Sequence, residues 1–107
     1  MKIKIKNGIE IEIESIDKCR GIKKFIGLMF KSRRANAKLF EFNISRQAIH
    51  SLFCPPFLAM WLDKNNRVLE HKFVRRARLS IRPKQKFSKL LEVPINKKYK
   101  EIIEEFK

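Results

Sequence analysis

The sequence predicts a mostly β fold: a β-rich α+β domain built as a small antiparallel β-barrel or sandwich of about seven short strands. Three observations predict it. The N-terminus alternates apolar and charged residues, short apolar segments recur between turn residues, and no internal repeat or low-complexity segment interrupts them. The chain has 107 residues, of which 44% are hydrophobic, so we expect a single domain over 1–107 with one real core.

Residues 1–14 predict a β-hairpin, because Lys and Ile alternate before Asn7-Gly8, and Ile and Glu alternate after it. A two-residue Asn-Gly loop would mix Ile and Glu on one face. A three-residue loop, with Gly8 in the left-handed position of a bulged turn, keeps the faces separate and is favoured. The expected pairs are Lys2 with Glu12, Ile3 with Ile11, Lys4 with Glu10, and Ile5 with Ile9.

A short helix is predicted after the first hairpin, begun by Ser15 or Asp17 and ended at Gly27. Its apolar positions would be Ile16, Cys19, Ile22 and Ile26, and it would plug one open end of the barrel. Further strands are predicted at 39–43, 47–54, 57–62, 67–74 and 87–93, with a turn at 63–66 and an irregular basic stretch at 75–86. A C-terminal helix follows, with one apolar face formed by Tyr99, Ile102, Ile103 and Phe106.

The cysteines and histidines form no known metal or catalytic motif. Cys19 and Cys54 have no C-x-x-C partner, and His50 and His71 lack the spacing of zinc ligands. On a strand, His50 and Cys54 would lie roughly 13 Å apart, too far for a catalytic dyad. We therefore predict no catalytic residues, no cofactor and no metal. The two thiols favour a reducing cytoplasm, and no segment is long and apolar enough for a transmembrane helix.

Carboxylates and phosphate loops give no stronger signal for an enzyme. Glu41, Glu70 and Glu92 are each isolated within a strand, and we expect them to face solvent. No nucleophile elbow, phosphate loop or dinucleotide fingerprint is present, and only three glycines occur. The sequence therefore leans against an enzyme.

The net charge of +15 is concentrated in two segments. Residues 16–38 hold eight basic residues against one acidic residue, and residues 67–100 hold twelve against two. Arginine suits bidentate contact with phosphate, so these segments predict a surface for nucleic acid or another polyanion. The candidate contacts are Arg33, Arg34, Arg75, Arg76, Arg78, Arg82, Lys84 and Lys86. The alternative explanation is a solvated surface of a Lys/Ile-rich, heat-adapted protein.

Several short segments, in order, resemble a known family. They are Gly27-Leu28-Met29-Phe30, Leu39-Phe40-Glu41-Phe42, Ala48-Ile49-His50-Ser51-Leu52-Phe53, Leu62-Asp63-Lys64-Asn65-Asn66-Arg67-Val68 and Leu90-Leu91-Glu92-Val93-Pro94. The order and spacing resemble the family named domain of unknown function 192, found in bacteria and archaea. The resemblance implies a compact, mostly β fold. It implies no established activity and supplies no catalytic residues.

Three hypotheses about function follow. The first is a non-enzymatic binding domain whose basic loops engage nucleic acid or another polyanion. The second is a small-ligand or enzymatic pocket in the barrel mouth, near His50, Trp61 and His71. The third is a protein-interaction module that uses an exposed edge strand or an apolar face.

Overall fold

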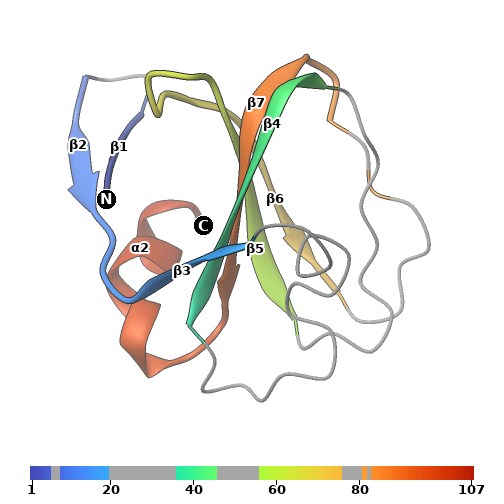
Figure 1. Cartoon of the computed structure of the whole chain (residues 1–107). Coiled ribbons are helices and arrows are strands. Elements are labelled where there is room, and N and C mark those ends of the chain that lie inside the picture. Colours follow the sequence, from blue (N-terminus) through green and yellow to red (C-terminus); the bar gives the residue numbers. More distant parts are fainter. Residues whose placement is uncertain (6–7, 20–35, 46–55, 76–80, 82) are drawn as a thin grey trace.

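Seven strands and two short helical segments form the described part of the chain (Figure 1). The structure is a computed structural model that describes residues 1–5, 8–19, 36–45, 56–75, 81 and 83–107. The strands are β1 (Lys2–Lys4), β2 (Glu10–Glu12), β3 (Ile16–Cys19), β4 (Ala37–Ser45), β5 (Phe57–Leu62), β6 (Val68–Val74) and β7 (Phe87–Pro94). The 3-10 turn η1 (Lys97–Tyr99) and helix α2 (Lys100–Glu105) follow. Within these residues, neither helical segment has the length and apolarity needed to cross a membrane.

Strands β1 and β2 form the predicted hairpin in the predicted register. Lys2 lies opposite Glu12, and Ile3 lies opposite Ile11. The Ile5 amide donates to the Ile9 carbonyl at 3.1 Å, and Gly8 has a φ of 75°, which a residue without a Cβ adopts at little cost. The hairpin therefore has the three-residue loop, which keeps its apolar and charged faces separate.

The other five strands form one sheet in the order β3-β4-β7-β5-β6. The pairs β4–β7, β7–β5 and β5–β6 are antiparallel, as predicted. β3 instead pairs parallel with β4, so the sheet is mixed. The described strands close no barrel: they make this sheet and the separate two-stranded hairpin.

The helix predicted after the hairpin is wrong where the structure describes it. Ser15 has a φ of 57°, which turns the chain out of the hairpin, and Ile16–Cys19 then runs as a strand beside Ala37. Pairing with β4 outweighs the helical spacing of the apolar residues. Residues 20–27 of that predicted helix, and the strand predicted at 47–54, lie outside the described residues.

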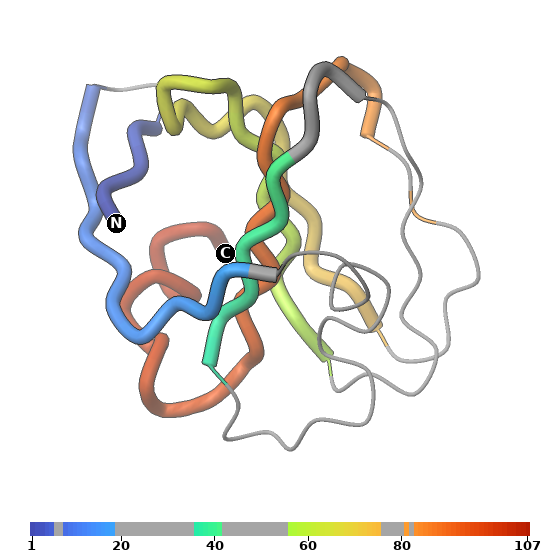
Figure 2. Tube along the Cα trace, in the orientation of Figure 1, coloured from blue at the N-terminus to red at the C-terminus, as the bar shows by residue number. Residues whose placement is uncertain are grey.

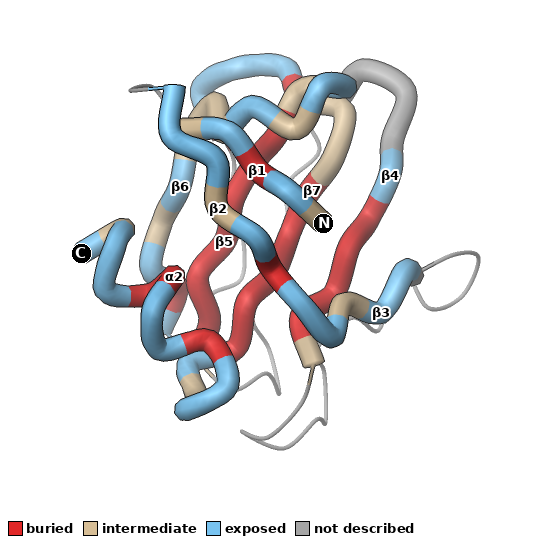
Figure 3. The backbone as a smooth tube through the Cα atoms, turned by 90° about the vertical axis from the view of Figure 1, so that its left-hand side faces the viewer, coloured by how far each residue is buried: buried red, intermediate tan, exposed pale blue. Residues whose placement is uncertain are grey.

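The inner strands of the sheet are buried on both faces. The helix-covered face meets the hairpin and α2, which lie on the same side of the sheet (Figures 2 and 3). Its cluster includes Ile3, Ile13, Leu39, Leu58, Met60, Leu62, Leu91, Val93, Ile102 and Ile103. The opposite face, here called the Trp61 face, carries Phe40, Phe57, Ala59, Trp61, Val74, Ile81, Phe87 and Leu90. This explains why β5 is apolar at every position: all six of its residues are buried.

The predicted C-terminal helix is confirmed as α2, and Tyr99, predicted on its apolar face, is buried in η1 just before it. The Tyr99 hydroxyl donates to the Ser15 carbonyl at 2.8 Å and accepts the Ala37 amide at 2.7 Å. These two residues stand at the start of β3 and β4. The hydroxyl therefore joins the C-terminal segment to the parallel strand pair.

We expect Tyr99→Phe to lower the free energy of unfolding by about 1–3 kcal/mol, because it leaves the buried Ala37 amide without an acceptor. Chemical denaturation of the variant and the native protein measures the difference. Phe106→Leu, a change on the same helical segment that removes no hydrogen bond, serves as the control. Equal stability of Tyr99→Phe and the native protein would contradict this role.

The same hydroxyl makes stability depend on alkaline pH. Desolvation by burial raises the pKa of Tyr99 above its ordinary value of 10.0; the Ala37 hydrogen bond lowers the pKa, and the nearby Asp17 charge raises it. Between the two pKa values, the folded state keeps the Tyr99 proton while the unfolded chain releases it. The contribution of this hydroxyl to the free energy of unfolding is therefore complete below pH 10 and is lost as the pH rises through the folded pKa. We expect the stability of the native protein to fall more steeply above pH 10 than that of Tyr99→Phe. Because the chain has one tyrosine, ultraviolet titration of tyrosinate measures its pKa directly.

Candidate functional site

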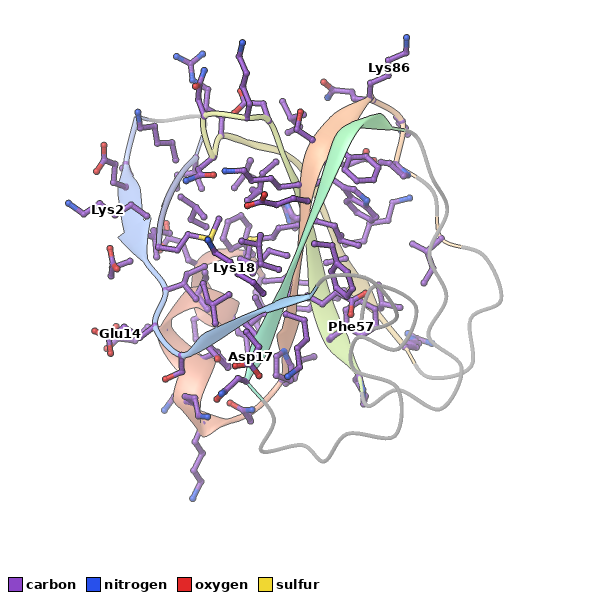
Figure 4. The ribbon with its side chains drawn as sticks, in the orientation of Figure 1. Lys2, Glu14, Asp17, Lys18, Phe57 and Lys86 are labelled. Atoms are coloured by element: carbon purple, nitrogen blue, oxygen red, sulfur yellow. The ribbon has the colours of Figure 1, made fainter. Side chains whose placement is uncertain are left out.

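Six basic residues surround the turn between β5 and β6 and the start of β7. We call this surface the basic end; it comprises Lys4, Lys64, Arg67, Lys84, Lys86 and Lys89. All are exposed except Lys89, which is half-buried. Lys86 projects from the upper edge of the sheet in Figure 4.

Asn66 holds the basic end together. Its carbonyl accepts the Lys4 amide at 2.8 Å, and its Oδ1 accepts Lys89 Nζ at 2.7 Å. Its φ of 65° is left-handed, a conformation that Asn tolerates better than most residues. One turn residue therefore connects the hairpin, the β5–β6 turn and β7.

The acidic groups at this end are engaged in local structure. Asp63 Oδ1 accepts the amides of Asn65 and Arg67 at 2.8 and 2.9 Å, which fixes the turn. Glu70 Oε2 accepts the Lys84 amide at 2.7 Å. Glu10 lies opposite Lys4 in the hairpin. Glu41 lies opposite Lys89 across β4 and β7. Among the described residues at this end, six cations thus outnumber four carboxylates, two of which accept backbone hydrogen bonds.

An open groove of ≈ 460 Å³ lies between the hairpin and the start of β6. Its apolar lining comes from Ile5, Val68 and Leu69, and its polar lining includes Lys4, Arg67 and Gln85. Lys4 and Arg67 also form an isolated parallel bridge beside it. The cations therefore border a hollow in which an anionic ligand could be held.

The structure places three of the sequence-predicted basic residues. Lys84 and Lys86 belong to the basic end. Arg75 follows Val74, which lies level with Phe57 and so with Pro94 at the far end of β7. At about 3.3 Å per residue, the length of β7 separates these levels by roughly 23 Å. Arg33, Arg34, Arg76, Arg78 and Arg82 lie outside the described residues.

The residues of the alternative pocket do not share one site. Trp61 is fully buried on the Trp61 face. His71 pairs with Met60, on the opposite face, and its ring meets that of Phe106 edge-on at 4.9 Å between centroids. The sheet therefore separates Trp61 from His71. His50 lies outside the described residues.

A row of charges on the Trp61 face, buried at Lys38 and Glu92 and exposed at Asp17, is a feature that the sequence did not predict. Asp17, Lys38 and Glu92 are register neighbours across β3, β4 and β7. Lys38 and Glu92 are 8% and 5% exposed, and Lys38 Nζ lies 2.5 Å from Asp17 Oδ2. The expectation that Glu92 faces solvent is therefore wrong, because this face of β7 is buried together with the cluster around Trp61.

Three more charged residues, Lys72, Glu70 and Glu41, lie on strands of the sheet. Across Ala59 on β5, the row continues to Lys72 on β6, whose Nζ lies 5.8 Å from the centre of the Trp61 ring. Glu70 is half-buried, and Glu41 is exposed as expected. Among the described residues, no group of three His, Cys, Asp or Glu side chains could hold a metal ion.

Comparison with known proteins identifies the fold. A "putative transcription regulator" from Sinorhizobium meliloti superposes with a TM-score of 0.75 at 13% identity, over 94% of this chain and 82% of that one. A protein of unknown function from Novosphingobium aromaticivorans superposes with a TM-score of 0.71 at 14% identity, over 87% of this chain and 70% of that one. The chain shares its fold with both. No family model and no curated protein matches its sequence.

We expect Lys38→Met to lower the free energy of unfolding by about 1–3 kcal/mol, because the buried carboxylate of Glu92 loses the cation beside it on β4. Lys18→Met is the matched control: Lys18 is exposed on β3, and its loss should change stability by less than about 0.5 kcal/mol. Thermal or denaturant unfolding compares the two variants. Equal stabilities of the two variants would show that Lys38 contributes no more to the free energy of unfolding than an exposed lysine does.

Proposed function

We propose that this protein is a non-enzymatic binding domain and that its basic end contacts the phosphates of a nucleic acid. The observation that carries the proposal is the convergence of Lys4, Arg67 and Lys89 on one turn through Asn66, beside an open groove. Cations carried on a fixed backbone beside a hollow suit phosphate contact better than the same charges spread over a surface.

The loop residues predicted from the sequence remain part of the proposal. Arg75, Arg76, Arg78 and Arg82 belong to the segment that joins β6 to β7, whose ends lie at opposite ends of the sheet. Lys84 and Lys86 follow directly at the basic end. A nucleic acid is long enough to contact both ends, because successive phosphates extend along its backbone. The similarity of fold to a protein named as a transcription regulator is compatible with this function.

We also propose that the chain is a cytoplasmic member of the family named domain of unknown function 192. The segments that carry the resemblance include the turn 62–68 and the strand 90–94. These are the β5–β6 turn, which forms the basic end, and the second half of β7.

Two double charge reversals test the basic end. We expect Arg67→Glu with Lys86→Glu to weaken oligonucleotide binding at least tenfold and to reduce the log–log salt slope by about 2, because each phosphate contact contributes about 1. Lys97→Glu with Lys100→Glu carries the same net charge but changes exposed residues at the α2 end, so it should bind as the native protein does. Fluorescence anisotropy with labelled single-stranded and duplex RNA and DNA, between about 50 and 200 mM salt, measures both quantities.

Two outcomes would contradict the proposal. No binding at about 50 mM salt would exclude a nucleic-acid partner, and equal loss in both double variants would reduce the effect to net charge alone. The triple variant Arg75→Glu, Arg76→Glu, Arg78→Glu separates the loop from the basic end. If it alone abolishes binding, the site belongs to the loop.

A further inference from the structure

We propose that the groove beside the basic end holds an unpaired base, so that the nucleic acid bound here is single-stranded; this inference rests on the proposed function. The groove lies where the hairpin meets the β5–β6 turn, at the top of the sheet in Figure 1. Its lining combines apolar side chains with cations, and a nucleotide combines the same two chemistries in its base and its phosphate.

Apolar side chains form one part of the groove wall. Ile5, Val68 and Leu69 line it, and each is half-buried rather than enclosed in the core. Val68 packs against the helix-covered cluster and Leu69 against the cluster of the Trp61 face. The surface that these side chains still expose to water gains free energy when a flat, weakly polar ring covers it.

Cations form another part of the wall. Lys4 and Arg67 line the groove, both are exposed, and their backbones are joined by the parallel bridge. Asp63 Oδ1 accepts the Arg67 amide at 2.9 Å, which fixes the backbone that carries this guanidinium. A guanidinium can stack on the face of a base or donate to a phosphate. A base in the groove therefore has its own phosphates within the reach of cations.

The size and form of the groove suit one base that belongs to a continuing strand. Its volume of ≈ 460 Å³ lies within the range of about 300–1,000 Å³ that is typical of small-molecule sites. Gly8 lines the hairpin side, and a Cβ in place of its hydrogen would meet no described atom within 4 Å. The groove is therefore open on this side, which leaves room for the strand to enter and leave.

A single strand satisfies this combination better than a duplex or a small anion does. In a duplex the bases are paired and stacked, so their faces cannot cover the apolar wall without being flipped out. In a single strand a base can turn into the groove while the phosphates on either side of it stay near the cations. A small organic anion would contact only one or two of the six cations of the basic end, whereas repeating phosphates can reach more of them.

Three probes of about ten nucleotides separate base contact from phosphate contact. They are a labelled oligothymidylate, an abasic strand of the same length, and a duplex of the same length. We expect the native protein to bind oligothymidylate at least tenfold more tightly than either of the others, measured by fluorescence anisotropy in the same buffer. Backbone amide chemical shifts of Ile5, Val68 and Leu69 should change with oligothymidylate and stay unchanged with the abasic strand.

A single substitution localises the base to the groove. Ile5→Thr keeps a β-branched residue but removes apolar surface, so it should weaken oligothymidylate binding at least threefold. The log–log salt slope should stay the same, because no phosphate contact is lost. Ile95→Thr is the matched control, since Ile95 is 41% exposed just past the far end of β7 and should be replaceable without effect on binding. Thermal unfolding of both variants checks that each is folded at the temperature of the binding measurement.

The outcomes distinguish this inference from the proposed function. Equal affinity for oligothymidylate and the abasic strand, or tighter binding of the duplex, would overturn the inference and leave phosphate contact at the basic end standing. Equal weakening by Ile5→Thr and Ile95→Thr would remove the base from the groove. Absence of binding by all three probes at about 50 mM salt would refute the proposed function and the inference together.

Discussion

The hydroxyl of Tyr99 connects the parts of this fold that the chain builds separately. It holds the Ser15 carbonyl, where the hairpin turns into β3, and the Ala37 amide, where β4 begins. The parallel pairing of β3 and β4 starts at the next step, where Ile16 meets Ala37. Tyr99 also places Ile102 and Ile103 under the helix-covered face. One side chain thus sets the relative positions of hairpin, sheet and helix.

The opposite face shows how a sheet that is buried on both sides can still carry charge. Lys38 and Glu92 sit among Phe40, Leu90 and Trp61, and each is opposed by an opposite charge on a neighbouring strand. Such a row is costly to bury unless its members are paired, and the pairing is correct in only one strand register. In contrast, the indole N–H of Trp61 is a buried donor without a hydrogen-bond partner in the described structure. The charged row therefore contributes to the specificity of the register as well as to stability.

Local patterns in the sequence predicted the local parts of the structure. The hairpin register followed from the alternation of Ile with Lys and Glu, and β5, the 63–66 turn and the terminal helix followed from composition and spacing. The strand at Ile16–Cys19 was missed because its apolar spacing also fits a helix, and only its contact with Ala37 decides between them. The basic end was partly predicted through Lys84 and Lys86. Lys4 and Arg67 could not be added, because their proximity depends on the Asn66 turn, which joins segments more than sixty residues apart.

The position of β7 in the sheet has a consequence for how the protein is made. β7 lies between β4 and β5, yet it is the last strand in the chain, and Tyr99 comes after it. During synthesis, β4 and the β5–β6 pair therefore leave the ribosome before β7, the strand that lies between them in the sheet. Unpaired strand edges of this kind are prone to aggregation, and contacts between distant segments slow folding. The sheet can be completed only when residues 87–99 have emerged, so the C-terminal segment controls when this protein first becomes folded.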